Sequence, residues 1–227
     1  MVCLLVAGHT GAEPKVYRAE YDASFKGLAI QATGLRKLEK LDENQYLLSA
    51  SANNFLGSVT EQTLFTIDDN GGIKPLEYQY HRRGLGSNRD AILSFDWERN
   101  QVLNDVQSTP WRMDIPDTAL DKLLYQFKVR QDLKAAYKRK QPWPKLSYDI
   151  ADGGRIKRYH FEVLGKDVTT TPAGTFQTIK VTRTQDDDRT TIFWLAPDYE
   201  FLPIRLRLFE DDNEGLELTL KKLEFDR

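Results

Sequence analysis

Cysteine is almost absent from the 227-residue chain, whose single example is Cys3. An intrachain disulfide and a cysteine-based metal site are both excluded, because each needs more than one thiol. Histidine is also scarce, and neither His81 nor His160 has a second histidine or a carboxylate at a metal-ligand spacing. We expect both to be ordinary strand residues, and the sequence predicts no metal and no other cofactor.

An excess of basic residues is missing as well. Lys and Arg together number 32 against 34 for Asp and Glu, which gives a formal net charge of -2. Nucleic acid is therefore not an expected partner, because no positive excess is available to neutralise phosphates. Long apolar runs are absent too, and no stretch approaches the roughly 20 residues that a membrane-spanning helix needs. We expect a chain that does not span a membrane.

The first twelve residues, MVCLLVAGHTGA, contain no charged side chain. A short apolar run followed by small residues is typical of the end of a secretory signal, with cleavage before Glu13. The alternative is an apolar N-terminal strand. We expect residues 1–12 to be a signal-peptide remnant and residues 13–227 to form a single β-rich domain in the periplasm.

Strand patterns separated by turn residues cover most of the remaining chain, in about thirteen segments. The step Asn70-Gly71 between two apolar segments is a strong signal for a hairpin. In the last segment, 215–225, the apolar alternation changes phase, which predicts a β-bulge near Lys221-Lys222. The fold class expected is mainly β, as a long antiparallel, strongly curved sheet or an incomplete β-barrel.

One segment, about 117–138, has the composition of a central α-helix, with no glycine or proline and with Asp117 or Thr118 available as a cap. At 100° per residue its apolar residues fall on two nearly opposite faces. One face holds Leu120, Leu123, Leu124 and Phe127, and the other holds Tyr125, Val129, Leu133 and Ala136. A helix that is apolar on two faces must be covered on two faces. We expect it either to be packed into the concave side of the sheet and capped from above, or to be wet on alternate sides with a kink near Val129-Arg130.

The stretch 194–208, WLAPDYEFLPIRLRL, gathers carboxylates and aromatic residues as an active site would. Its two prolines, however, end one strand and begin the next, because proline cannot donate to a strand ladder. We interpret the stretch as a rigid corner. Asp198 and Glu200 would lie in the connection, with Trp194 and Phe201 packed beneath it.

No catalytic constellation stands out. The G-x-S-x-G motif of serine hydrolases is absent. Asp96 and Glu98 flank Trp97, as in a sugar site, but on a strand both would share one wet face. Acidic clusters such as 186–188 fall where strands reverse, and Asp and Asn favour turns, so calcium sites are not expected. The chain is expected to be non-enzymatic.

Two tryptophans lie in Pro-Trp segments on either side of the predicted helix. They are either rims of a cavity beside the helix or staples that hold the helix to the sheet. The candidate ligand-binding residues are Trp111, Leu120, Leu124, Phe127 and Trp143. Around the loop 85–90, candidate contacts for an anionic group are Arg82, Arg83 and Arg89, unless the loop is simply a solvated charged turn.

Four segments of the chain resemble a bacterial family, domain of unknown function 3108 (DUF3108). They are LDKLLYQFKVRQDL (120–133), IADGGRIKRYHFEVLG (150–165), TTPAGTFQTIKVTR (170–183) and FWLAPDYEFLPIRLRL (193–208). The resemblance extends from about Tyr17 to the end of the chain. It implies a β-rich fold and export to the cell envelope, and it assigns no catalytic residue.

The leading functional hypothesis is a periplasmic, non-enzymatic protein that binds a hydrophobic or amphipathic envelope component, such as a lipid or lipoprotein-like ligand, in the concave face of the sheet. One alternative is a structural or assembly factor of the cell envelope that acts through protein contacts, and another is a cell-wall polysaccharide hydrolase. A carrier predicts an apolar cavity under the helix, and a scaffold predicts a filled core with a free edge or apolar patch. An enzyme predicts two titratable groups that converge in a cleft.

Overall fold

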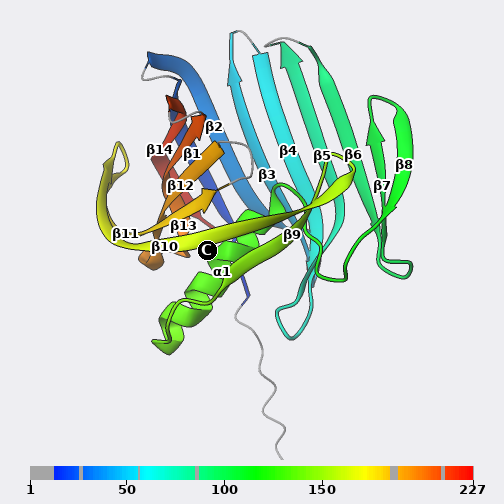
Figure 1. Ribbon diagram of the computed structural model, residues 1–227. Coiled ribbons are helices and arrows are strands. Elements are labelled where there is room, and N and C mark those ends of the chain that lie inside the picture. The colour runs from blue at the N-terminus through cyan, green and yellow to red at the C-terminus, as the bar shows by residue number, and fades with distance from the viewer. Residues whose placement is uncertain are drawn as a thin grey trace, which may run out of the picture.

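A computed structural model describes residues 13–25, 28–55, 57–84, 87–184, 189–210 and 213–226. The expected signal remnant 1–12 and the acidic turn 186–188 lie outside the described residues. Fourteen strands in the described ranges form one sheet, which curls around the helix α1 (Figure 1). The mainly β, antiparallel, strongly curved sheet with a central helix is confirmed.

The chain runs through two meanders with the helix between them. The first comprises β1 (Tyr17–Phe25), β2 (Leu28–Lys40), β3 (Gln45–Asn54), β4 (Gly57–Ile67), β5 (Ile73–Gly84), β6 (Arg89–Asp96), β7 (Gln101–Val106) and β8 (Thr109–Asp114). The helix α1 spans Leu124–Arg139. The second comprises β9 (Leu146–Asp152), β10 (Arg155–Thr171), β11 (Gly174–Thr184), β12 (Arg189–Ala196), the 3-10 turn η1 (Pro197–Tyr199), β13 (Leu202–Glu210) and β14 (Asn213–Phe225).

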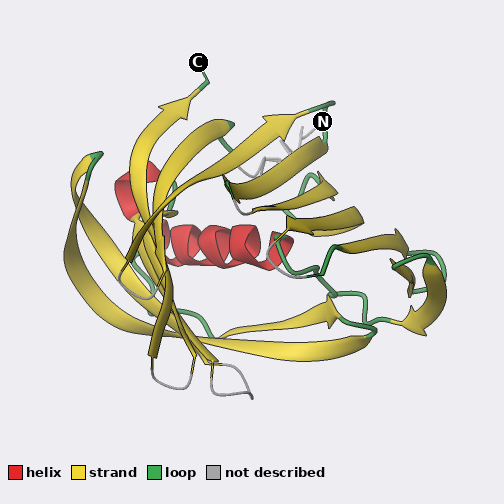
Figure 2. Cartoon of the chain, turned by 90° about the horizontal axis from the view of Figure 1, so that it is seen from above, coloured by secondary structure: helices red, strands yellow, loops and turns green. Residues whose placement is uncertain are grey.

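The first and last strands join the two meanders into one sheet, because β1 pairs antiparallel with β14 from Tyr17 opposite Phe225 onward. The sheet therefore has its two edges at β8 and β9, and it does not close into a barrel. Seen from above, the strands wrap around α1 (Figure 2). The edges approach each other at one point, where the ring of Trp111 on β8 lies so close to Gly154 that a Cβ there would be 2.7 Å from it.

Two features of local strand structure follow the sequence pattern. Glu20 pairs with Lys222 and Tyr21 with Leu220, so Lys221 is the extra residue of a β-bulge. This confirms the predicted bulge. Asn70 and Gly71 form the turn between β4 and β5, where Gly71 has a φ of 81° that suits glycine. The predicted hairpin is also confirmed.

Two details of the strand prediction are wrong. β8 occupies a segment that we expected only to flank the helix, which raises the number of strands from about thirteen to fourteen. The segment 155–165, which we expected to be a complete strand, continues as β10 to Thr171. The register shift between Val163 and Gly165 leaves Leu164 as the extra residue of a β-bulge, so the strand passes the glycine without ending.

The helix begins later than predicted, at Leu124, and runs without interruption to Arg139. The preceding residues are drawn into the sheet instead, since Leu120 donates its N–H to Asp149 O at 2.9 Å and accepts from Ala151 N at 2.8 Å. Neither Asp117 nor Thr118 caps the helix. Asp121 does so, because its Oδ1 accepts the N–H groups of Leu123 and Leu124, both at 2.8 Å.

Both apolar faces of α1 are buried, as expected for a helix packed into the concave side of the sheet. The residues Leu124, Tyr125, Phe127, Val129, Leu133 and Ala136 are all in the core. The core is continuous through both meanders, from Phe65 and Tyr78 on one side to Val181 and Phe193 on the other. The concave face is therefore largely filled.

Candidate functional site

The corner between β12 and β13 holds the middle of α1. Glu200 and Phe201 have φ values of 59° and 54°, which turns the chain so that the carbonyl oxygen of Glu200 faces the helix. Arg130 donates to this oxygen from Nε and Nη2, both at 3.2 Å. The carboxylate of Glu200 forms an ion pair with Lys134, one turn further along α1.

The aromatic residues of the corner pack as the sequence predicted. Phe201 is buried, and Trp194 is buried with its Nε1 donating to Asp167 Oδ2 at 2.8 Å. Pro203 is the second residue of β13, beside a register shift in its pairing with β12. The interpretation of 194–208 as a rigid corner is confirmed. The corner also supplies the carbonyl oxygen that accepts hydrogen bonds from Arg130. That contact joins residues 70 positions apart in the chain, so local sequence patterns do not predict it.

Arg130 is a buried cation, with 7% of its surface exposed. Its Nη1 donates to the hydroxyl of Tyr17 at 3.1 Å, and its guanidinium lies over the rings of Tyr17 and Phe127. Within the described ranges no carboxylate lies at ion-pair distance from it; its acceptors are neutral oxygens. Burying a charge without a counter-ion is unfavourable. This cation is therefore the most distinctive feature of the helix.

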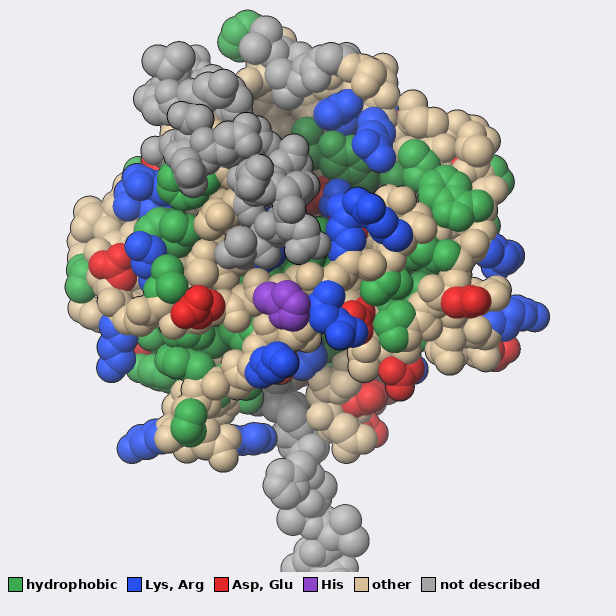
Figure 3. Space-filling model, viewed as in Figure 1, with side chains coloured by type: hydrophobic (Ala, Val, Ile, Leu, Met, Phe, Trp, Pro, Cys, Tyr) green, Lys and Arg blue, Asp and Glu red, His purple; other side chains and the backbone are tan. Residues whose placement is uncertain are grey.

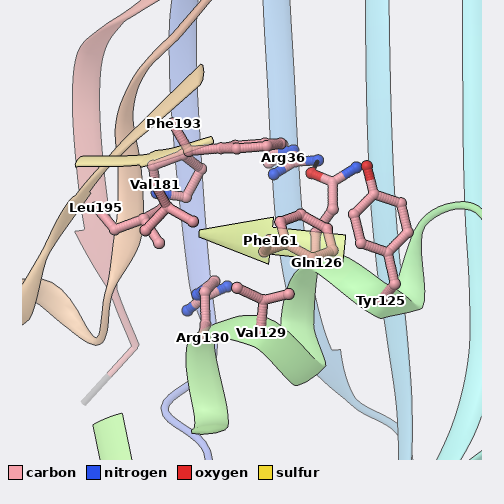
Figure 4. Close-up of a pocket in the computed structure, with 10 residues that line it drawn as sticks. Arg36, Tyr125, Gln126, Val129, Arg130, Phe161, Val181, Phe193 and Leu195 are labelled. Carbon is pink, nitrogen blue, oxygen red and sulfur yellow. Dashed lines mark hydrogen bonds between the residues drawn. The ribbon is translucent and has the colours of Figure 1, made fainter. Parts of the chain in front are cut away.

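A small cavity lies on one side of Arg130, between α1 and the second meander. Figure 4 shows Arg36 reaching from the sheet toward Gln126 and Tyr125, with Arg130 on the helix below. The volume is about 20 Å³, which is room for about one water molecule. The apolar part of its lining consists of Val129, Phe161, Val181, Phe193, Leu195 and Pro203. This cavity alone does not hold an acyl chain.

A much larger groove, of about 1330 Å³, lies on the other side of Arg130. It runs between the solvent-facing side of α1, the β2–β3 and β4–β5 turns and the segment before β1. Its apolar lining includes Tyr46, Ile67, Phe127 and Ala135. Arg130 lines both the groove and the small cavity, so the buried cation forms the boundary between them.

The groove carries charges of both signs, but its acidic residues are mostly engaged. Glu13 forms an ion pair with Lys40 at 2.6 Å, and Glu200 pairs with Lys134. Asp68 accepts the backbone N–H groups of its own turn. The cations of the lining are Lys15, Lys40, Arg130, Lys134, Lys138 and Arg139. Among these cations, Arg130 is the one that is buried, next to the apolar residues of the lining.

The five predicted ligand-binding residues do not gather around one cavity. Leu120 and Leu124 are core residues that line neither cavity, whereas Phe127 lines the groove. Trp111 lies on β8 against Gly154, and Trp143 stacks on Tyr137 with ring centroids 6.4 Å apart.

Tyr137 packs in turn on Phe201, at 5.6 Å between ring centroids. Trp143 therefore acts as a staple between α1 and the corner, and both tryptophans remain partly exposed.

The three predicted anion contacts near residues 85–90 lie at the ends of β5 and β6. Arg82 donates to Ser87 O at 2.9 Å, and Arg83 forms an ion pair with Asp90 at 2.7 Å. Arg89 is exposed. These contacts are the ones expected of a solvated charged turn, and Leu85 and Gly86 lie outside the described residues.

Among the described residues, Asp121 is the carboxyl group whose pKa is raised. Burial raises the pKa of Asp121 to about 6, and it lies near Glu61 and Tyr78 on the first-meander side of α1. By contrast, the Arg99 guanidinium holds the pKa of Asp96 below its usual value, whereas a general acid needs a raised pKa. Asp121 lines neither cavity and caps the helix, so its perturbation has a structural cause.

In the part of the chain that the structure describes, no cluster of three or more His, Cys, Asp or Glu residues could hold a metal ion. Nor does any helix within those ranges combine the length and apolarity needed to cross a bilayer.

Sequence reasoning missed Arg36, Arg130 and Arg183 as interior residues. Arg183 mirrors Arg130 on the opposite side of α1, where its Nη1 donates to the hydroxyl of Tyr125 at 2.8 Å. One signal was available for Arg130. It lies between Phe127 and Leu133, each three residues away, and both are apolar residues on a helix face.

A protein-family model described as protein of unknown function, DUF3108, matches residues 20–221. The chain belongs to the DUF3108 family. The match spans all fourteen strands at least in part, together with α1 and the corner. No curated protein matches this DUF3108 chain.

Several solved structures are similar to this DUF3108 chain at low identity. One is a protein inferred to be exported, with a YmcC-like fold, from Bacteroides fragilis: identity 10%, coverage 93% of this chain and 96% of that one, TM-score 0.37. Another is a protein inferred to be a lipoprotein from Parabacteroides distasonis: identity 12%, coverage 93% and 96%, TM-score 0.36.

A third is a domain from Vibrio parahaemolyticus inferred to be an outer membrane lipoprotein-sorting protein: identity 10%, coverage 93% and 86%, TM-score 0.24. Likenesses at these scores are too weak to transfer a function.

Proposed function

We propose that the protein is an exported, non-enzymatic envelope protein that binds an amphipathic anion in the groove beside α1. The acidic group would be a carboxylate or phosphate paired with Arg130. The apolar part would lie along Phe127, Tyr46 and Ile67, which share the groove with this cation. The apolar, uncharged composition of residues 1–12 supports export to the periplasm.

The single observation that carries the proposal is the buried guanidinium of Arg130. Arginine has five N–H donors, and three of its hydrogen bonds reach neutral oxygens of Tyr17 and Glu200. The other two donors have no acceptor among the described residues, and we infer that they serve a ligand. An acidic group bound in the groove would supply the negative counter-charge for Arg130, since no described carboxylate lies beside this guanidinium.

The size of the groove favours an amphiphile over a free inorganic anion. Ligand sites of about 300–1,000 Å³ hold drug-sized molecules, and the groove, at about 1330 Å³, exceeds that range. The small cavity beyond Arg130 is lined largely by apolar side chains and has room for about one water. An acyl chain would therefore lie in the groove, unless the side chains around Arg130 rearrange.

The test is a binding titration with palmitate, lysophosphatidylglycerol and hexadecanol. We expect both anions to bind, and hexadecanol to bind at least about tenfold more weakly, because a charge-assisted hydrogen bond contributes roughly 1.5–3 kcal/mol. Arg130→Gln should weaken the two anions to the level of the alcohol. Equal affinity for the anions and the alcohol would refute the role of Arg130.

The matched control is Arg183→Gln, which removes another buried arginine that packs on α1 but lines neither cavity. It should leave anion binding intact. If Arg130→Gln does not fold, Lys134→Gln offers a second probe in the same groove. That variant should weaken anion binding while hexadecanol binding stays constant.

A structural or assembly factor that acts through protein contacts is the second candidate. The filled concave core favours it, and so does the edge strand β8, whose residues Thr109–Arg112 are exposed. Pro110 limits strand addition along that edge, because it has no N–H to donate. Protein purified from its own envelope in a stable complex, without any bound amphiphile, would favour this candidate over the first.

A further inference from the structure

The end of α1 and the segment after it form a second surface that the groove does not explain. Every residue from Tyr137 to Lys145 is exposed. The rings of Tyr137 and Trp143 stack with an interplanar angle of 10°, yet they keep 45% and 36% of their surfaces exposed. Figure 1 shows this end of α1 projecting beyond the strands that surround the rest of the helix.

The charge of this surface is of one sign. Residues 133–148 contain no Asp or Glu, although the whole chain has a net charge of -2. Its four exposed cations are Lys138, Arg139, Lys140 and Lys145. None of the four forms an ion pair with another described residue, whereas Lys134, one turn earlier, pairs with Glu200. Figure 3 shows Lys and Arg side chains on both sides of a hydrophobic side chain on this projecting lobe.

Ordinary helix-end chemistry explains only part of this arrangement. Basic residues in the last turn are stabilised by the helix dipole, which accounts for Lys138 and Arg139. Lys145 lies six residues beyond the helix end and gains nothing from the dipole. The helix dipole also does not explain why two stacked aromatic rings are exposed among these cations. The contact that joins α1 to the corner uses only the buried sides of the rings.

We propose that this surface, residues 137–145, docks on a lipid bilayer that contains anionic lipids. Trp and Tyr favour the interfacial region of a bilayer, where an apolar ring meets polar headgroups. Clustered Lys and Arg beside them are attracted to the negative surface potential of anionic lipids. Docking brings the groove close to the membrane, because Lys138 and Arg139 also line its rim.

Vesicle co-sedimentation tests the docking, with vesicles of phosphatidylglycerol and phosphatidylcholine compared with phosphatidylcholine alone at low ionic strength. The protein should bind the anionic vesicles, and salt should weaken the binding by screening. The variant K138Q/R139Q/K140Q/K145Q should lower the partition coefficient about 100-fold or more, since each basic residue near an anionic surface contributes several-fold.

The matched control is R89Q/R112Q/R155Q/K166Q, which removes four exposed basic residues elsewhere and gives the same net charge. It should retain wild-type binding. Arg130→Gln should also retain it, so failure of the groove proposal and failure of the docking proposal give different results. Equal losses in the two quadruple variants, or equal binding to both kinds of vesicle, would overturn the proposal.

Quenching by brominated lipids reports on the aromatic pair. The other tryptophans are Trp97, Trp111 and Trp194. Fluorescence should be quenched on binding to brominated anionic vesicles, and Trp143→Phe should remove most of that quenching while the protein stays bound. Unchanged quenching in Trp143→Phe would place the membrane contact elsewhere and refute this orientation.

Discussion

Replacing Asp121 with asparagine is expected to change how the stability of the protein depends on pH. The carboxyl group is fully buried, and its Oδ1 accepts hydrogen bonds from Thr63 Oγ1 and from two backbone N–H groups of the helix start. Its Oδ2 has no hydrogen-bond partner among the described residues. Burial therefore dominates, and it raises the pKa from its ordinary value of 3.8 to about 6.

The sign of the effect follows from the direction of this shift. The folded chain binds the proton of Asp121 more tightly than the unfolded chain does, so the contribution to stability is present below about pH 4. It is lost as the pH rises through 6. One pKa unit corresponds to about 1.4 kcal/mol, so the wild-type protein should lose about 2–3 kcal/mol from this group between pH 4 and 7.5. Asparagine keeps an oxygen in the position of Oδ1 and carries no charge, so this loss should vanish in Asp121→Asn.

Urea unfolding at pH 4, 6 and 7.5 measures the difference in free energy of unfolding between wild type and Asp121→Asn. The variant should gain about 2–3 kcal/mol relative to wild type across that interval. The exposed Asp117, four residues earlier, provides a matched control, because Asp117→Asn removes the same charge outside the core. If the difference in free energy of unfolding between wild type and Asp121→Asn were the same at all three pH values, the raised pKa of Asp121 would be refuted.

Three further substitutions, one of them a control, test the packing of the sheet. Gly154→Ala should destabilise the protein by roughly 1–3 kcal/mol, because the new Cβ would meet the ring of Trp111 at 2.7 Å and the residue has a φ of 79°. Gly153→Ala, with a φ of 63° but open space around it, should cost only the backbone strain of about 1 kcal/mol, and equal losses would contradict this contact. Trp194→Phe should cost at least about 1 kcal/mol, because it removes the hydrogen bond to Asp167 and part of a buried ring. The same unfolding experiment measures this loss, and an unchanged midpoint would contradict it.

The features predicted correctly from sequence are those that short-range patterns determine. The bulge at Lys221 follows from a change of phase within one strand, and the turn at Asn70-Gly71 follows from the φ that glycine allows. The corner at 194–208 follows from two prolines. The helix is apolar on two faces, and this predicted its burial inside the curved sheet.

The errors arise where distant residues compete with local propensity. Residues 117–123 have helical composition, but Leu120 bridges to Ile150 on an edge strand thirty residues away. The backbone of Leu120 thereby forms hydrogen bonds with Asp149 and Ala151 on β9. The helix then starts after this segment, and Asp121 caps it. Composition and periodicity contain no information about that pairing.

The candidate site was harder to predict than the fold. The expectation rested on apolar residues, yet Leu120 and Leu124 belong to the core, and the distinctive residue is the cation Arg130. Its environment is made by Tyr17 and by the carbonyl oxygen of Glu200, which lie 113 and 70 positions away in the chain. A single sequence does not reveal which oxygen atoms surround a guanidinium.

The anionic-amphiphile site is tested most directly by native mass spectrometry, with lipid extraction, of protein purified from its own cell envelope. If the proposed function holds, we expect one bound carboxylate or phosphate amphiphile per chain, retained in Arg183→Gln and lost in Arg130→Gln. Protein recovered without lipid, or with the same amphiphile bound in both variants, would contradict the site.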